Sequence, residues 1–138
     1  MRESERLLSN TFDAIQDLVV VIDKDLRVIM SNWKGHDYIP EQARQGHPHC
    51  YTCFVKRETP CEPCHALEVF AEGRTKEVEL TNPLDGRIRE VHVLPVFDHE
   101  NNVIMVVEHV RDITRRKRDE EALRKSQQEY AMLVNYAN

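Results

Sequence analysis

Four cysteines within fifteen residues are the most chemically distinctive feature of this sequence. They form two C-x₂-C pairs and are all the cysteines of the 138-residue chain: Cys50, Cys53, Cys61 and Cys64. Three histidines flank the pairs: His47, His49 and His65. Thiolate sulfur and imidazole nitrogen are the donors that zinc prefers in proteins. The stretch is therefore a candidate metal site, with the cysteines as ligands and the histidines as alternates.

Several kinds of chemistry are compatible with this spacing. Four thiolates can close a tetrahedral zinc site or hold an iron–sulfur cluster. Two thiols can also act as a redox switch if neighbours such as Lys56 and Arg57 lower a cysteine pKa. Residues 61–65 read CEPCH, which matches the attachment sequence of c-type haem. In the least specific interpretation, Cys64 packs as a small apolar residue and the other cysteines are incidental.

The composition excludes several classes of protein. Hydrophobic residues make up 41% of the chain and charged residues 31%, as in a soluble protein of one domain with a short extension. The sequence has no apolar run of the roughly 20 residues that a bilayer span needs, and residues 1–16 do not resemble a secretory signal. We therefore expect a cytoplasmic protein without membrane insertion. In that compartment close thiols serve metal or redox chemistry, and c-type haem is less expected. The net charge of −5 argues against nucleic-acid binding.

The hydrophobic pattern predicts an α+β fold. It indicates helices over 5–16, 40–45 and 61–71, a hairpin of strands 18–23 and 26–31, and three further strands over 75–80, 87–97 and 103–113. This order predicts a five-stranded antiparallel sheet with helices on one face, flanked by amphipathic helices at both ends. In the helix over 61–71, Cys61 and Cys64 would lie in the first turn and point the same way.

A second kind of site is a small-molecule cavity inside the fold. The residues that would line it are interpreted first as core: Trp33, Val91, Val93, Ile104 and Val106. The histidines outside the cysteine stretch are interpreted as surface or strand positions: His36, His92, His99 and His109.

The chain divides into three segments in this interpretation. Residues 1–16 form an amphipathic helix, residues 17–114 the domain, and residues 115–138 a second helix or linker. The apolar stripes of both helices lie outside the expected core, so we expect a homodimer formed through them. Residues 127–138 loosely repeat the pattern of residues 7–15, as though a second module began there.

The predicted order of elements, closing in Asp112-Ile113-Thr114, resembles the PAS family of sensory domains, which end in Asp-Ile-Thr before a signalling helix. The resemblance covers residues 10–114, and residues 18–32 are similar to the opening hairpin of the family. It implies a sensory input module that is not itself an enzyme. It also implies a downstream output domain in the same chain, as in bacterial histidine kinases, diguanylate cyclases or transcription regulators.

The cysteine stretch is similar to that of a cysteine-bearing subgroup in bacterial sensor kinases, through Cys50-Tyr51, Phe54, Arg57 and Pro60-Cys61-x-x-Cys64. The chain departs from that pattern by adding Cys53 and by having His65 where proline is frequent. The resemblance implies sensing of redox state, oxygen or a ligand through a metal or thiol site. The Asn-Cys-Arg-Phe motif of flavin photoreceptors is absent, so flavin is not expected. A thiol-dependent redox enzyme is the alternative, disfavoured because no βαβ unit is predicted around a C-x-x-C pair.

Overall fold

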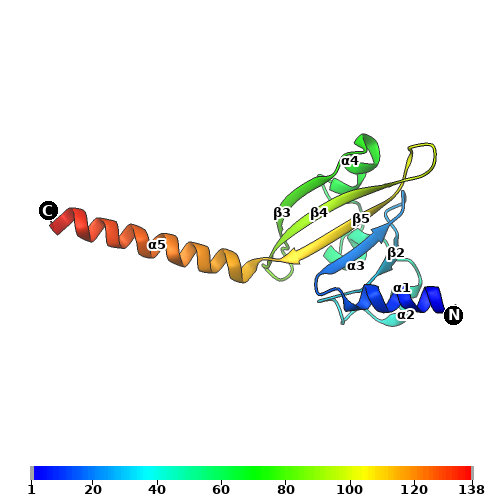
Figure 1. Cartoon of the computed structure of the whole chain (residues 1–138), viewed down its shortest axis with the longest axis horizontal. Helices are drawn as coiled ribbons and strands as arrows, with labels where there is room; N and C mark the ends of the chain where they lie inside the picture. Colours follow the sequence, from blue (N-terminus) through cyan, green and yellow to red (C-terminus); the bar gives the residue numbers. More distant parts are fainter. Residues whose placement is uncertain (1, 138) are drawn as a thin grey trace.

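A five-stranded antiparallel sheet forms the centre of the fold, as seen in a computed structural model that describes residues 2–137 (Figure 1). The strands are β1 (Leu18–Ile22), β2 (Val28–Ser31), β3 (Lys76–Thr81), β4 (Ile88–Phe97) and β5 (Val103–Asp112), in the spatial order β2-β1-β5-β4-β3. The helices are α1 (Glu3–Ala14), α2 (Glu41–Gln45), α3 (Cys50–Val55), α4 (His65–Glu72) and α5 (Thr114–Ala137). The predicted α+β class, with its flanking helices, is confirmed.

The core lies on the sheet face that α4 covers, and it follows from alternation along the strands. Side chains of a strand point alternately to the two faces, so every second residue is buried. In β5, Val106 and Val110 are both buried, and Val69 of α4 packs against the same cluster with no exposed surface. Further members of the core come from β1 and β4: Leu18, Val20, Ile22, Val91 and Val93. The central strand β5 therefore contributes to the core along most of its length.

The first hairpin differs from its prediction at one strand. β2 begins at Val28, because Leu26 adopts a φ of 63° and is buried with only 3% of its surface exposed. The Asp23 carboxylate shapes this turn by accepting the backbone N–H groups of Asp25 and Arg27 at 2.9 and 3.0 Å. Such side-chain capping of a turn is typical of aspartate.

The segment between the hairpin and β3 contains two differences from the sequence interpretation. Helix α3 was not predicted, since six residues are too few to show a periodic pattern. Helix α4 begins at His65, four residues later than predicted. Pro63 disfavours helical backbone at Glu62, so the turn containing Cys61 cannot be helical. The prediction that Cys61 and Cys64 share a helical turn is therefore wrong.

The passage from β5 to α5 is closed by hydrogen bonds around Thr114, which is 1% exposed. The Thr114 hydroxyl donates to Asp112 at 2.6 Å and accepts the Ile88 backbone N–H at 2.9 Å. Partial burial would by itself raise the pKa of Asp112. Hydrogen bonds from Arg87 and Thr114 outweigh it and hold that pKa well below its usual range. These contacts fix the direction in which α5 leaves the sheet (Figure 1).

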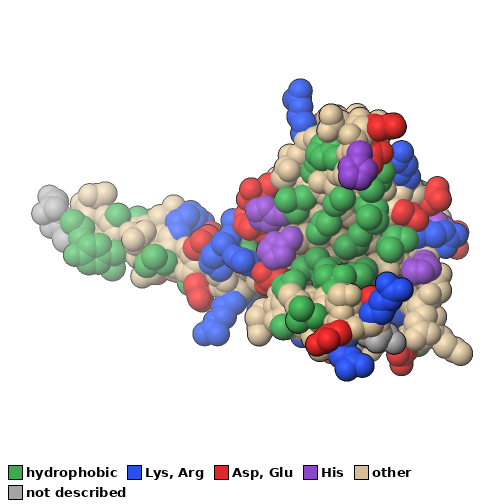
Figure 2. Space-filling model, turned by 45° about the vertical axis from the view of Figure 1, so that its right-hand side comes forward, with side chains coloured by type: hydrophobic (Ala, Val, Ile, Leu, Met, Phe, Trp, Pro, Cys, Tyr) green, Lys and Arg blue, Asp and Glu red, His purple; other side chains and the backbone are tan. Residues whose placement is uncertain are grey.

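The sheet face opposite the core carries an apolar patch. Figure 2 shows hydrophobic side chains gathered at the middle of this face, with histidines at the margin. Cross-strand register aligns Val21 with Val107, and Val107 with Leu94, which is 38% exposed. Met30 of β2 lies opposite Val21 and continues the row. This outer face is consequently suited to covering by another surface.

The terminal helices have no buried apolar stripe. None of the residues of α1 is buried, and on α5 Leu123 and Leu133 are 60% and 71% exposed. Asn32 holds the connection from α1 to β1, because its side-chain amide donates a hydrogen bond to the Asp17 carbonyl at 2.8 Å. The division into segments 1–16, 17–114 and 115–138 remains a prediction, and its end residues Met1 and Asn138 lie outside the described residues. Over residues 2–137, no helix combines the length and apolar character that a membrane crossing requires.

Candidate functional site

Three of the four cysteines line one cavity of about 610 Å³ on the inner side of the sheet. Cys50 reaches it from α3, Cys61 from the connection after α3, and Cys64 from the residue that precedes α4. Glu108 of β5 lines the same cavity from the sheet. Cys53 does not line it, although it packs against the core. The fold therefore brings both C-x₂-C pairs to one region, with Cys50, Cys61 and Cys64 on the cavity wall and Cys53 outside it.

The position of Cys50 is set by backbone hydrogen bonds to the hairpin of β1 and β2. Its N–H donates to the Leu26 carbonyl at 2.8 Å, and just before it the Pro48 carbonyl accepts the Val28 N–H at 2.8 Å. These bonds hold the start of α3 against β2. One turn later, the Cys53 thiol lies 3.8 Å from the Cys50 carbonyl oxygen and donates to it.

Arg57 folds the chain back after α3. Lys56 ends the helix in the left-handed conformation, with φ of 54°, and the Arg57 N–H bonds the Tyr51 carbonyl at 2.9 Å. The Arg57 guanidinium then donates to the carbonyls of Thr59 and Pro60 at 3.2 and 3.3 Å. This compact reversal returns Cys61 to the cavity that Cys50 lines.

The thiols are protonated at neutral pH. All four cysteines are free, and burial raises the pKa of each one, that of Cys53 to about 11. Arg57 opposes this rise at Cys61 without cancelling it. Arg57 thus acts on the Cys61 pKa in the direction that the sequence predicts, but burial outweighs it, so the net pKa is raised. Protonated, half-buried thiols are poor nucleophiles, whereas a metal ion can displace their protons on binding.

Glu108 is a charged cavity residue that the sequence interpretation missed, as it missed Glu62 and Arg89. It lies between the inward Val106 and Val110, and burial raises the pKa of its carboxyl from 4.5 to about 7. The signal was present in the alternation along β5, since a glutamate occupies an inward position of an otherwise apolar strand face.

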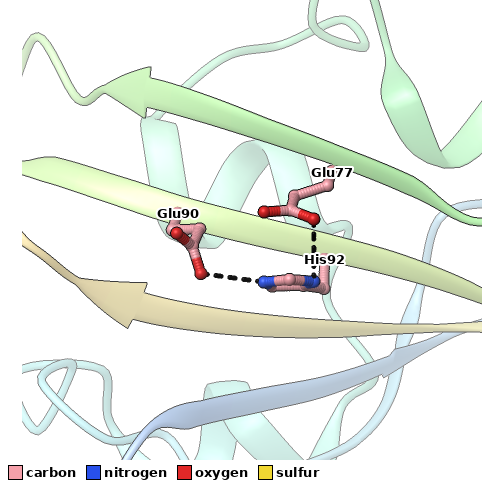
Figure 3. Close-up of side chains that lie close together, drawn as sticks. All are labelled: Glu77, Glu90 and His92. Atoms are coloured by element: carbon pink, nitrogen blue, oxygen red, sulfur yellow. Dashed lines mark hydrogen bonds and ion pairs between the residues drawn. The ribbon is translucent and has the colours of Figure 1, made fainter.

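The donor atoms around the cavity are not drawn together into a coordination shell. Among residues 2–137, one group of three or more Asp, Glu, His and Cys donors has all its ligand atoms within 4.8 Å of one another, namely Glu77, Glu90 and His92 (Figure 3). It lies on the outer face, where Glu77 and His92 are cross-strand partners. No three donor atoms of the cavity residues therefore lie within 4.8 Å of one another.

The outer-face group is part of an ion-pair network at the base of α5. His92 Nε2 lies 2.9 Å from a Glu90 oxygen, and His92 Nδ1 lies 3.9 Å from Glu77 (Figure 3). Arg116 of α5 reaches Glu90 at 3.7 Å, while Lys117 reaches Glu79 at 3.1 Å. These contacts connect the first turn of α5 to β3 and β4.

The predicted cavity residues are divided by the fold. Val91 and Val93 line the cavity, whereas Trp33 and Val106 are buried in the core beside it. Ile104 is 40% exposed and does not line it.

The histidines also differ from one another in their surroundings. His65 lines the cavity with Nδ1 3.0 Å from Glu68, whereas His47 Nδ1 lies 3.1 Å from the Val28 carbonyl oxygen and His49 stacks on Tyr51. His36 was interpreted as a surface or strand position, but it is 5% exposed and lines the cavity. Burial lowers its pKa, and its Nδ1 lies 3.0 Å from the Tyr38 hydroxyl.

The sheet order and the closing Asp-Ile-Thr junction are those of a sensory domain, and family comparison agrees. The family model described as the PAS fold matches residues 12–118. Since this covers most of the chain, the protein belongs to the PAS family, whose members are generally sensory modules without enzymatic activity. A comparison with curated proteins found no match.

Solved structures with this fold include sensor proteins. An RNA-binding light-oxygen-voltage receptor superposes with a TM-score of 0.62 at 17% identity, over 93% of this chain and 39% of that chain. A sensory box sensor histidine kinase from Vibrio cholerae gives 0.54 at 14% identity, over 81% and 94%. A PAS domain from Colwellia psychrerythraea gives 0.56 at 18%, over 82% and 99%. At these identities the likeness establishes the fold alone.

Proposed function

We propose that this chain is the sensory input module of a bacterial signalling protein such as a histidine kinase, and that its stimulus acts at the cysteine-lined cavity. The observation that carries the proposal is the convergence of Cys50, Cys61 and Cys64 on one cavity beneath β5. Strand β5 continues through Ile113 into α5, so a change at the cavity wall is transmitted directly to the exit helix. Membership of the PAS family, whose members are generally sensory modules, supports this role.

The chemistry of the cavity favours a thiophilic metal ion, zinc or the iron of a cluster, over a free-thiol switch. Three thiols face one space, but their raised pKa values leave little thiolate at neutral pH in the absence of a metal. Bound metal would supply the charge that stabilises the thiolates, at the expense of their protons. Because no three donor atoms of the cavity lie within 4.8 Å of one another, binding would draw the 56–64 connection toward α3. That contraction is the conformational signal we propose.

Anaerobic purification followed by elemental analysis and an ultraviolet–visible spectrum tests this function. We expect bound zinc, or the absorption of an iron–sulfur cluster, in the wild-type chain and its loss in Cys61→Ala and Cys64→Ala. Removing the metal should accelerate hydrogen exchange across residues 50–64 while β1 and β5 stay protected, because thiolate ligation of zinc can contribute on the order of 10 kcal/mol. A chain that takes up no metal and keeps full protection over 50–64 under reducing conditions would refute the metal-sensing proposal.

We also infer that the module is a homodimer in the cytoplasm, paired through α1 and α5 and continuous with an output domain. The exposed apolar positions Leu123, Tyr130 and Leu133 are spaced by seven and three residues, as in the seam of a coiled coil. Leu7 and Leu8 on α1 are likewise exposed.

Sedimentation across a concentration series checks the dimer. Ending the chain after Thr114, or replacing Tyr130 and Leu133 by glutamate, should shift it toward monomer. The paired change Gln128→Glu and Ala131→Glu, off the seam with the same added charge, is the matched control. Equal association in all four chains would exclude a contact through α5.

A further inference from the structure

The Glu108 carboxylate faces the cavity without a partner of opposite charge. Alternation along β5 places it on the same side as the buried Val106 and Val110, in the middle of the inner sheet face. Within residues 2–137 its side chain makes neither a hydrogen bond nor an ion pair. A carboxylate in such a position is unfavourable unless something in the cavity neutralises it.

The cationic side chains of the cavity do not serve this purpose. Arg57 and Arg89 both line it, but the Arg57 guanidinium donates to backbone carbonyls of its own turn. The Arg89 guanidinium is paired with Asp85 at 2.7 Å. The cavity is therefore lined by three thiols and two carboxylates, the exposed Glu62 and the inward Glu108, with its two arginines engaged elsewhere.

Cys53 differs from the other cysteines in its relation to this carboxylate. Cys50, Cys61 and Cys64 line the cavity together with Glu108, whereas Cys53 does not line it. The Cys53 thiol is directed to the Cys50 carbonyl within α3. Position thus groups three cysteines with Glu108 and leaves Cys53 outside the cavity.

We propose that Glu108, rather than Cys53, completes the ligand set of a thiophilic divalent cation bound by Cys50, Cys61 and Cys64. This inference rests on the proposed metal-sensing function and assigns the fourth donor of that site. Three sulfurs and one carboxylate oxygen are an acceptable tetrahedral set for zinc. Because Glu108 belongs to β5, the bound cation would join the cysteine segment to the strand that continues into α5, four residues before β5 ends.

His65 is the competing fourth donor. It lines the cavity, and the contact of its Nδ1 with Glu68 at 3.0 Å is of the kind that orients metal-binding histidines. However, it directly follows Cys64, which is the extended residue before α4, and side chains of adjacent residues do not lie on the same face. A cation bound by Cys64 is consequently poorly placed to be bound by the His65 ring as well.

Titration of the reduced, metal-free chain with Co²⁺ and Zn²⁺ tests the assignment. We expect Cys53→Ala to bind with affinity within about threefold of wild type and to keep the sulfur-to-cobalt charge-transfer intensity of three thiolates. Glu108→Gln should weaken binding by more than about 100-fold, beyond the usual effect of a residue outside the ligand set. It should also shift the cobalt d–d bands, and Glu108→Asp should restore part of the affinity. Circular dichroism of each metal-free variant confirms folding.

Two results distinguish the inference from the function on which it rests. If wild type binds and Cys53→Ala or His65→Ala abolishes binding while Glu108→Gln retains it, the ligand assignment is overturned and the metal site stands. If wild type binds neither cation, both are overturned.

Discussion

Replacing Glu108 by leucine should stabilise the metal-free chain by about 3 kcal/mol more at pH 8 than at pH 4. Burial raises the pKa of Glu108 from 4.5 to about 7 in the folded chain. Each pKa unit corresponds to about 1.4 kcal/mol, so the full difference is about 3 kcal/mol. Within that pH range the folded state holds a proton that the unfolded state has released. The wild-type free energy of unfolding therefore falls as the pH rises from about 4.5 to about 7.

The leucine variant lacks this titration, so the stability difference between the two proteins should appear over the same pH range and then level off. Urea unfolding at intervals between pH 4 and pH 8, with reductant and chelator present, measures the difference. Glu129→Leu on α5 is the matched control, since the Glu129 side chain is exposed to solvent, and it should show no such pH dependence. A constant difference between Glu108→Leu and wild type across this range would mean that Glu108 is not desolvated.

Replacing Thr114 by valine should destabilise the chain by about 2 kcal/mol, despite the nearly equal size of the two side chains. Thr114 is 1% exposed, and its hydroxyl is both the acceptor for the Ile88 N–H and a donor to Asp112. Valine leaves a buried N–H without this acceptor, which costs about 1–3 kcal/mol. The same change loosens the start of α5, so trypsin should cleave more rapidly after Arg115 and Arg116 in the folded variant.

Urea unfolding and native-state proteolysis measure the two effects. Thr75→Val is the control, because Thr75 is exposed ahead of β3 and a surface change of this kind usually stays within about 0.5 kcal/mol. Equal stability of Thr114→Val and Thr75→Val would show that the junction hydrogen bonds do not hold the exit helix.

Periodicity in the sequence was sufficient to predict the strands of the sheet and most of the helices of the chain. Strands such as Leu18–Ile22 and Val103–Asp112 are long enough to show alternation or β-branched enrichment, and the closing Asp-Ile-Thr was recognisable as a motif. Periodicity did not predict the structure of residues 50–64. Helix α3 is too short to show a periodic pattern, and α4 begins only at His65 because Pro63 disfavours helical backbone before it. The elements that carry the cysteines were thus the least predictable part of the chain.

By itself the sequence determined that this chain has an α+β sensory fold with all its thiols in one short stretch. The tertiary structure decided which thiols face one another. The turn built by Arg57 returns Cys61 to the cavity that Cys50 lines, whereas Cys53 does not line that cavity. The tertiary structure also placed Glu108 on the same cavity as Cys50, Cys61 and Cys64, although Glu108 follows Cys64 by 44 positions in the sequence. Local propensity carries no information about such encounters, because they depend on how the sheet register and the helix packing bring distant segments together.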